Sequence, residues 1–157
     1  MISDLINSGI NCLHIDADAV FQKNPFTYLK GLHKDICFSQ GATFPQRIFC
    51  KQNFVVRGGM HYTISNEGTK KVWSEFSVLT KKYKDDQTAM NEYLYANAKW
   101  NQNPNTETDL LYLDRHKYKG FHDPVHGFIK KLNICLLPHR LFSRYYMNSD
   151  SIMYHDE

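Results

Sequence analysis

The chain has few cysteines, and none of them form a pair at metal-binding spacing. Its 157 residues include four cysteines, namely Cys12, Cys37, Cys50 and Cys135, and no C-x-x-C pair. This spacing argues against a zinc ribbon. Three of the four stand in apolar, strand-like runs and are expected to be small buried residues, whereas disulfide pairing among the four is left open.

Long apolar runs and a strong charge of one sign are also missing. No apolar run approaches the length of a transmembrane helix, and the first residues lack the basic region of a signal peptide. The 19 basic and 16 acidic residues give a net charge of +3, which is too balanced to indicate nucleic-acid binding. Aromatic residues are abundant instead, with 10 Tyr, 10 Phe and 2 Trp, so a chain of this length can build the core of one domain.

Strand-like and helix-like patterns alternate along the chain. Strands are expected at residues 10–15, 35–39, 53–57, 60–64, 110–113, 132–137 and 152–155, and helices at 2–7, 25–29, 66–83 and 85–96. Loops or irregular segments are expected at 41–51, 101–109 and 116–127. This alternation predicts an α/β fold with a mainly parallel or mixed sheet.

Asp16-Ala17-Asp18 is the most informative motif of the sequence. It follows the apolar run 10–15, so two carboxylates stand where a buried strand leads into a loop. Ligands of open α/β sheets bind just beyond the carboxyl ends of strands. Paired carboxylates at that place suit Mg²⁺ or Mn²⁺ held against a substrate phosphate. The alternative is a solvated surface turn, in which aspartate is common.

Two further segments carry candidate site residues. Gly58-Gly59 interrupts a strand pattern, which indicates either a bulge or a close approach of the backbone to a ligand. Arg57 stands directly before them and could bring a cation near a phosphate or a sugar. Asp86-Gln87 begins a predicted helix, where the two side chains either face a ligand or serve as plain capping residues.

In this order of elements, residues 2–26 resemble the D-x-D segment of the nucleotide-diphospho-sugar transferase family, which comprises glycosyltransferases of the GT-A fold. Further short matches follow in the family's order: 35–38, 59–62 with 69–73, Asp86-Gln87 with Asn91, and 136–138 with 141–142. Together they span nearly the whole chain, and five matches in the right order are more specific than D-x-D alone.

The resemblance implies a fold and an activity. It implies one partial domain over residues 1–157, with a GT-A-like mixed sheet flanked by helices. The matched segments begin midway through the family's domain, so the N-terminal nucleoside-binding strands are expected to be lacking. The implied activity is metal-dependent transfer of a sugar from a nucleotide-diphospho-sugar, a UDP-sugar in the first instance, to a glycan or glycoprotein acceptor. The family also implies the Golgi or another secretory lumen, with no nucleic-acid partner.

The metal ligands implied by the resemblance are three residues. Asp18 binds Mn²⁺ or Mg²⁺ directly, and Asp16 contacts the donor ribose or a metal-bound water. GT-A enzymes often add a late histidine to this site, and His155 in the final predicted strand matches it.

The resemblance also assigns donor-binding and catalytic residues. Gly58 and Gly59 lie beside the donor, together with the acidic pair. Asp86 and Gln87 face the donor sugar and its reacting carbon as catalytic residues.

Two other functions compete with the transferase. The segment 16–20 fits the D-x-D-x-[TV] motif of haloacid-dehalogenase-like phosphatases, in which Asp16 would be a nucleophile and Asp18 a general acid. Such enzymes need a second acidic pair after an apolar strand, yet Asp85-Asp86 follows the basic segment 81–84. The third possibility is a catalytically inactive glycosyltransferase remnant that acts as a binding module, which a partial domain would favour.

Overall fold

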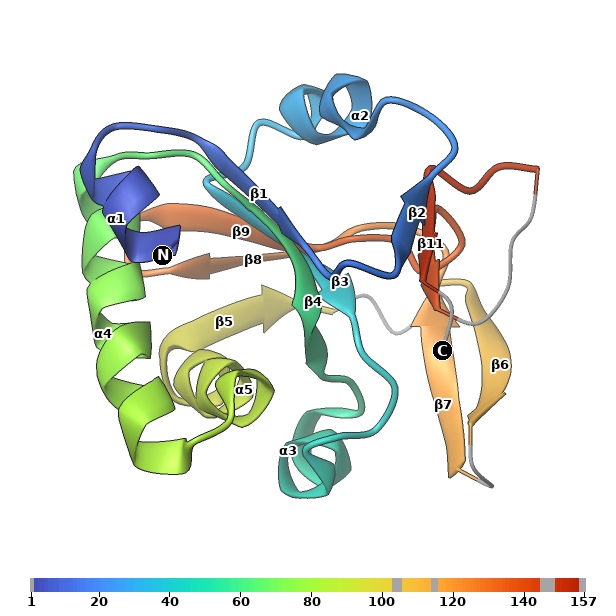
Figure 1. Ribbon diagram of the computed structural model, residues 1–157. Helices are drawn as coiled ribbons and strands as arrows, with labels where there is room; N and C mark the ends of the chain where they lie inside the picture. Colours follow the sequence, from blue (N-terminus) through green and yellow to red (C-terminus); the bar gives the residue numbers. More distant parts are fainter. Residues whose placement is uncertain (1, 103–105, 114–115, 145–148, 156–157) are drawn as a thin grey trace.

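The computed structural model describes residues 2–102, 106–113, 116–144 and 149–155 (Figure 1). The helices are α1 (Ile2–Asn7), α2 (Pro25–Gly31), α3 (Gln46–Gln52), α4 (Glu67–Tyr83) and α5 (Asp86–Asn97). The strands are β1 (Cys12–Ile15), β2 (Ala19–Phe21), β3 (Ile36–Gln40), β4 (Val56–Thr63), β5 (Ala98–Asn101), β6 (Thr108–Leu113), β7 (His116–Phe121), β8 (Val125–Ile129), β9 (Leu132–Leu136), β10 (Phe142–Arg144) and β11 (Met153–His155).

A six-stranded sheet in the order β1-β4-β3-β9-β8-β5 forms the centre of the fold. Strands β3 and β9 are parallel, whereas the other neighbours in this sheet are antiparallel. The predicted mixed α/β sheet is therefore confirmed, and it is consistent with a GT-A-like fold. Strands β10, β11 and β2 form a second small sheet, and β6 and β7 form a separate hairpin.

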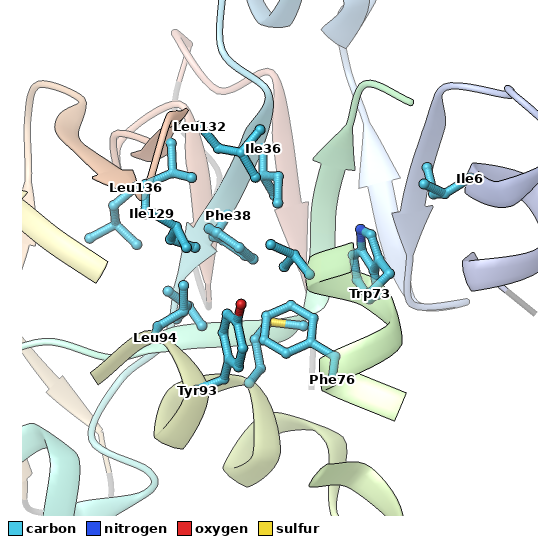
Figure 2. Packing of buried hydrophobic residues seen from close by; sticks show 14 of the residues in the cluster. Ile6, Ile36, Phe38, Trp73, Phe76, Tyr93, Leu94, Ile129, Leu132 and Leu136 are labelled. Carbon is cyan, nitrogen blue, oxygen red and sulfur yellow. The ribbon is translucent and has the colours of Figure 1, made fainter. Parts of the chain in front are cut away.

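Helices cover both faces of the central sheet. On one face, Phe76 of α4 and Tyr93 and Leu94 of α5 pack on Ile36 and Phe38 of β3 (Figure 2). Cys37 lies between Ile36 and Phe38 and packs on the opposite face of the sheet, because successive residues of a strand alternate between faces.

The second cluster joins the sheet to α2 and the small sheet. It contains Leu29 of α2, Tyr62 of β4, Phe142 of β10 and Met153 of β11, all buried. Figure 1 shows α2 on the side of the sheet opposite α5. Burying a large apolar side chain contributes about 1.5–3 kcal/mol, so these two clusters fix the sheet between the helical layers.

The helix starts follow the local sequence with one difference. Asp85 accepts a hydrogen bond from the Thr88 amide at 2.5 Å, as expected for the cap of α5. Helix α4 is capped by Asn66 and not by the expected Ser65, because Asn66 and Thr69 exchange two hydrogen bonds in a capping box. The Ser65 hydroxyl instead donates to the Ile6 carbonyl at 2.6 Å.

Two segments expected to be irregular contain regular structure. The loop predicted at 41–51 includes most of α3, a short helix that buries Ile48 and pairs Arg47 with Glu92 of α5. The segment predicted as irregular at 116–127 contains β7 and the start of β8. Both predictions were wrong because short elements depend on tertiary contacts more than on local pattern.

All four cysteines are free thiols in the structure. Cys12, Cys37 and Cys135 are buried as expected, and Cys50 is exposed. Within the described residues, none of the helices is long and apolar enough to cross a membrane.

Candidate functional site

The acidic motif lies at the carboxyl end of edge strand β1. Pairing of β1 with β4 ends where the Asp16 amide donates to the Gly59 carbonyl at 2.8 Å. The Asp16 carbonyl then accepts from the Ala19 amide at 3.1 Å, which closes a tight turn that carries Asp18 on the exposed surface. The strand end predicted for the motif is confirmed, and both carboxylates stand on this one turn.

Gly59 is a glycine because the Asp16 carboxylate occupies the space beside it. A Cβ built on Gly59 would lie 2.0 Å from Asp16 Oδ2 and 3.0 Å from Arg57 Nε. Arg57 Nη2 in turn lies 3.8 Å from Asp16 Oδ2, with side-chain exposure of 8% for the arginine and 42% for the aspartate. A buried guanidinium needs nearby acceptors, so this cation holds the Asp16 carboxylate against β4.

Gly58 packs against the first residues of α5. Its amide donates to Gln87 Oε1 at 3.4 Å, and its missing Cβ would lie 3.4 Å from Asp86 Oδ1. Asp16 and Asp86, far apart in the sequence, thus approach two adjacent glycines of one strand. The structure therefore places Asp86 and Gln87 beside Gly58 and places Asp16 beside Gly59.

Strand β4 is bulged at this place. Phe38 of β3 lies opposite His61, whereas Gln40 lies opposite Val56, so a step of two positions along β3 faces a step of five positions along β4. The bulge expected from Gly58-Gly59 is confirmed.

A cavity of about 400 Å³ opens beside Gly58 and Asp86. The aromatic rings that line it belong to His14, His61, Trp73 and Phe76. The ring centroids of His14 and His61 lie 4.8 Å apart, and those of His61 and Trp73 lie 4.7 Å apart. A second cavity of about 410 Å³ lies at the β6–β7 hairpin and is lined by none of the predicted site residues.

Sequence reasoning missed His61 as a feature of the site. Burial lowers its pKa to about 3, with a smaller effect of neighbouring His14, so the ring is neutral near pH 7. Its Nδ1 atom has no hydrogen-bond partner within the described part of the chain. Only the register of β1 against β4, which places His14 opposite His61, reveals this stacked pair.

The residues that could hold a metal are Asp16 and Asp18. His155 pairs through its backbone with Ala19, directly after Asp18, but its side chain lies outside the described residues. Among the residues that the structure describes, no group of three or more His, Cys, Asp or Glu side chains could hold a metal ion. A metal at this turn would therefore take its remaining ligands from a substrate, from water or from residues that are not described.

The second acidic pair required by the phosphatase alternative is not delivered by a strand. Asp85 caps α5 and Asp86 is its first residue, and the preceding element is helix α4. Asp85-Asp86 therefore does not supply the second phosphatase motif.

One of three comparisons with known proteins gave a match. The family model described as nucleotide-diphospho-sugar transferase matches residues 1–156, which is essentially the whole chain. Searches among curated proteins and among solved structures gave no match. The chain belongs to the nucleotide-diphospho-sugar transferase family.

Proposed function

We propose that the chain is a metal-dependent glycosyltransferase that moves a sugar from a nucleotide-diphospho-sugar, a UDP-sugar in the first instance, to a glycan or glycoprotein acceptor. Family membership supports a glycosyltransferase-like function. The observation that carries the metal-dependent part is the contact of Asp16 with Gly59 and Arg57 at the carboxyl end of β1. Ligands of open α/β sheets bind at such strand ends.

The residues present fit Mn²⁺ or Mg²⁺. Asp16 and Asp18 offer only carboxylate oxygens, which both ions accept. Mg²⁺ is commonly held by one or two carboxylates together with substrate phosphates, so two aspartates on one turn are a sufficient protein contribution. The tight space beside Gly59 keeps the Asp16 carboxylate in one place before a ligand arrives. When bound, the cation would neutralise negative charge on the leaving diphosphate.

The other groups of the site have roles that follow from their positions. Arg57 orients Asp16 and adds positive charge near the place proposed for the diphosphate. Asp86 is exposed beside Gly58 at the cavity mouth, where its carboxylate can accept hydrogen bonds from sugar hydroxyls. Gly58 and Gly59 lack side chains, which leaves room for the Asp86 and Asp16 carboxylates to lie directly against β4.

Hydrolysis of a nucleotide-sugar donor in the presence of Mn²⁺ tests the proposal. Wild-type protein should release sugar and nucleoside diphosphate, and Asp18→Asn should abolish the release. Asp123→Asn is the matched control, because Asp123 is an exposed aspartate outside the site and its variant should keep full activity. Nucleotide binding without any turnover would identify a binding module instead, and unchanged activity of Asp18→Asn would remove the metal role.

A further inference from the structure

We propose that Gln87 and Asn91 are positioning residues that clamp α5 onto β4, and that Asp86 alone of this helix start contacts the donor sugar. This inference rests on the proposed function and revises the catalytic role expected for Gln87. It assigns a physical task to each polar position of the segment Asp86-Gln87 with Asn91.

Asn91 uses its whole amide group on backbone partners. Its Oδ1 accepts from the Val56 amide at 2.9 Å, and its Nδ2 donates to the Val56 carbonyl and to the Gln87 carbonyl, each at 2.8 Å. The side chain is fully buried, with 0% exposure. A buried amide with both ends engaged is costly to disturb, so Asn91 fixes the distance between α5 and β4.

Gln87 and Asn91 contact β4 beyond the part of this strand that pairs with β1. The Val55 carbonyl faces β3, where it accepts from the Gly41 amide. Because successive residues of a strand direct their amide and carbonyl groups to opposite edges, those of Val56 face away from β3. Pairing of β1 with β4 ends at the hydrogen bond between Asp16 and Gly59. Beyond that point, Asn91 supplies the donor and the acceptor that a neighbouring strand would have supplied to Val56.

Gln87 acts one helical turn earlier in the same way. Its Oε1 accepts from the Gly58 amide at 3.4 Å, and its Nε2 donates to the Phe44 carbonyl at 2.7 Å. Residues four apart lie on the same face of a helix, so Gln87 and Asn91 contact Gly58 and Val56, which are two apart on the strand. Both ends of the Gln87 amide are therefore engaged by backbone groups.

Asp86 is left facing the site. Its Oδ1 accepts from the Gln87 amide at 2.7 Å, its carboxylate is exposed, and it lines the cavity together with Gly58. A displacement of about 1 Å in a reacting geometry can cost about 10²-fold in rate. The clamp thus determines where the Asp86 carboxylate stands relative to the donor sugar.

Amide hydrogen exchange of the ligand-free protein tests the clamp without any assay of activity. Asn91→Ala should speed exchange at Val56 at least tenfold, and Gln87→Met, which keeps a side chain of similar length, should do so at Gly58. The matched control is Asn97→Ala, because Asn97 is exposed and its Nδ2 donates to the Tyr93 carbonyl at 2.9 Å, a bond that stays within α5. Unchanged exchange in both clamp variants would overturn the proposal.

Donor hydrolysis then separates positioning from catalysis. Gln87→Met and Asn91→Ala should each lower kcat about 10- to 100-fold with little change in the KM for the donor. The double variant should lose no more than the worse single variant, because both changes loosen the same packing of α5 on β4. If Gln87→Met abolishes turnover while exchange at Gly58 stays at the wild-type rate, Gln87 is catalytic and the proposal fails.

The two hypotheses can fail separately. If wild-type protein hydrolyses no donor, the proposed function fails, and the exchange rates still decide whether the clamp exists. If Asn91→Ala does not fold, Gln87→Met carries both measurements alone, since Gln87 is only half-buried.

Discussion

Replacing Gly59 by alanine should release the Asp16 carboxylate while leaving the fold intact. The added Cβ would stand 2.0 Å from Asp16 Oδ2, and Cβ contacts below 3.0 Å essentially do not occur, so the carboxylate must retreat by about 1 Å. Asp16 is 42% exposed and can turn toward solvent. The loss of stability should therefore lie near the lower end of the 1–3 kcal/mol typical of overpacking, about 1 kcal/mol, which lowers Tm by about 2–4 °C.

The effect on metal binding should be larger than the effect on stability. Residues that orient a metal ligand typically change metal affinity about 10- to 100-fold when they are altered. Because Gly59→Ala displaces Asp16 from Arg57, we expect a loss in this range for Mn²⁺. Calorimetric titration of Mn²⁺ in the presence of a nucleoside diphosphate measures the affinity, and thermal unfolding measures the stability.

Gly58→Ala is the matched control in the same strand. Its Cβ would lie 3.4 Å from Asp86 Oδ1, an ordinary van der Waals contact, so Mn²⁺ affinity should stay at the wild-type value. The reasoning is refuted if Gly59→Ala binds Mn²⁺ as tightly as wild type, or if both alanine variants weaken binding equally.

Two further predictions concern titration and thiol chemistry. Burial lowers the pKa of His61 from 6.5 to about 3, so the unfolded chain binds a proton at a higher pH than the folded chain does. The free energy of unfolding should therefore fall as the pH drops from about 6.5 toward 3, by up to about 1.4 kcal/mol per pH unit. His61→Phe should make the urea midpoint less dependent on pH in this range, and an equally steep dependence would contradict the assignment. Cys50 is exposed and the other three cysteines are buried. A thiol reagent should therefore modify one cysteine of the native chain quickly and all four cysteines in urea. Rapid reaction of a second cysteine in the native chain would contradict the burial of the other three.

The long elements of the fold could be predicted from local pattern. The apolar run before Asp16 predicted strand β1. Apolar residues at helical spacing predicted helix α4, in which Val72 and Phe76 are buried. The β8–β9 hairpin was harder, because its turn holds Lys130 at a positive φ of 54° where glycine or asparagine would be the usual signal. Histidines and glycines among its strand residues also obscured the alternation between buried and exposed positions.

The site could be predicted in part. The sequence placed Asp16 and Asp18 at a strand end, and the bulge at Gly58-Gly59 was expected. The contact between Asp16 and Gly59 depends on the register of two strands distant in sequence, which local pattern does not determine. The ion pair between buried Arg57 and half-exposed Asp16 follows from the same register. The contacts of Asp16 with Gly59 and Arg57 could therefore be identified only from the three-dimensional structure.

The joint binding of Mn²⁺ and a nucleoside diphosphate tests the central claim most directly. If Asp16 and Asp18 hold a cation that also binds the diphosphate, each ligand must raise the affinity for the other by the same factor. Electron paramagnetic resonance of free Mn²⁺ should show this mutual gain for wild-type protein and its loss in a variant with both aspartates changed to asparagine. A variant that retains the wild-type gain would contradict the account.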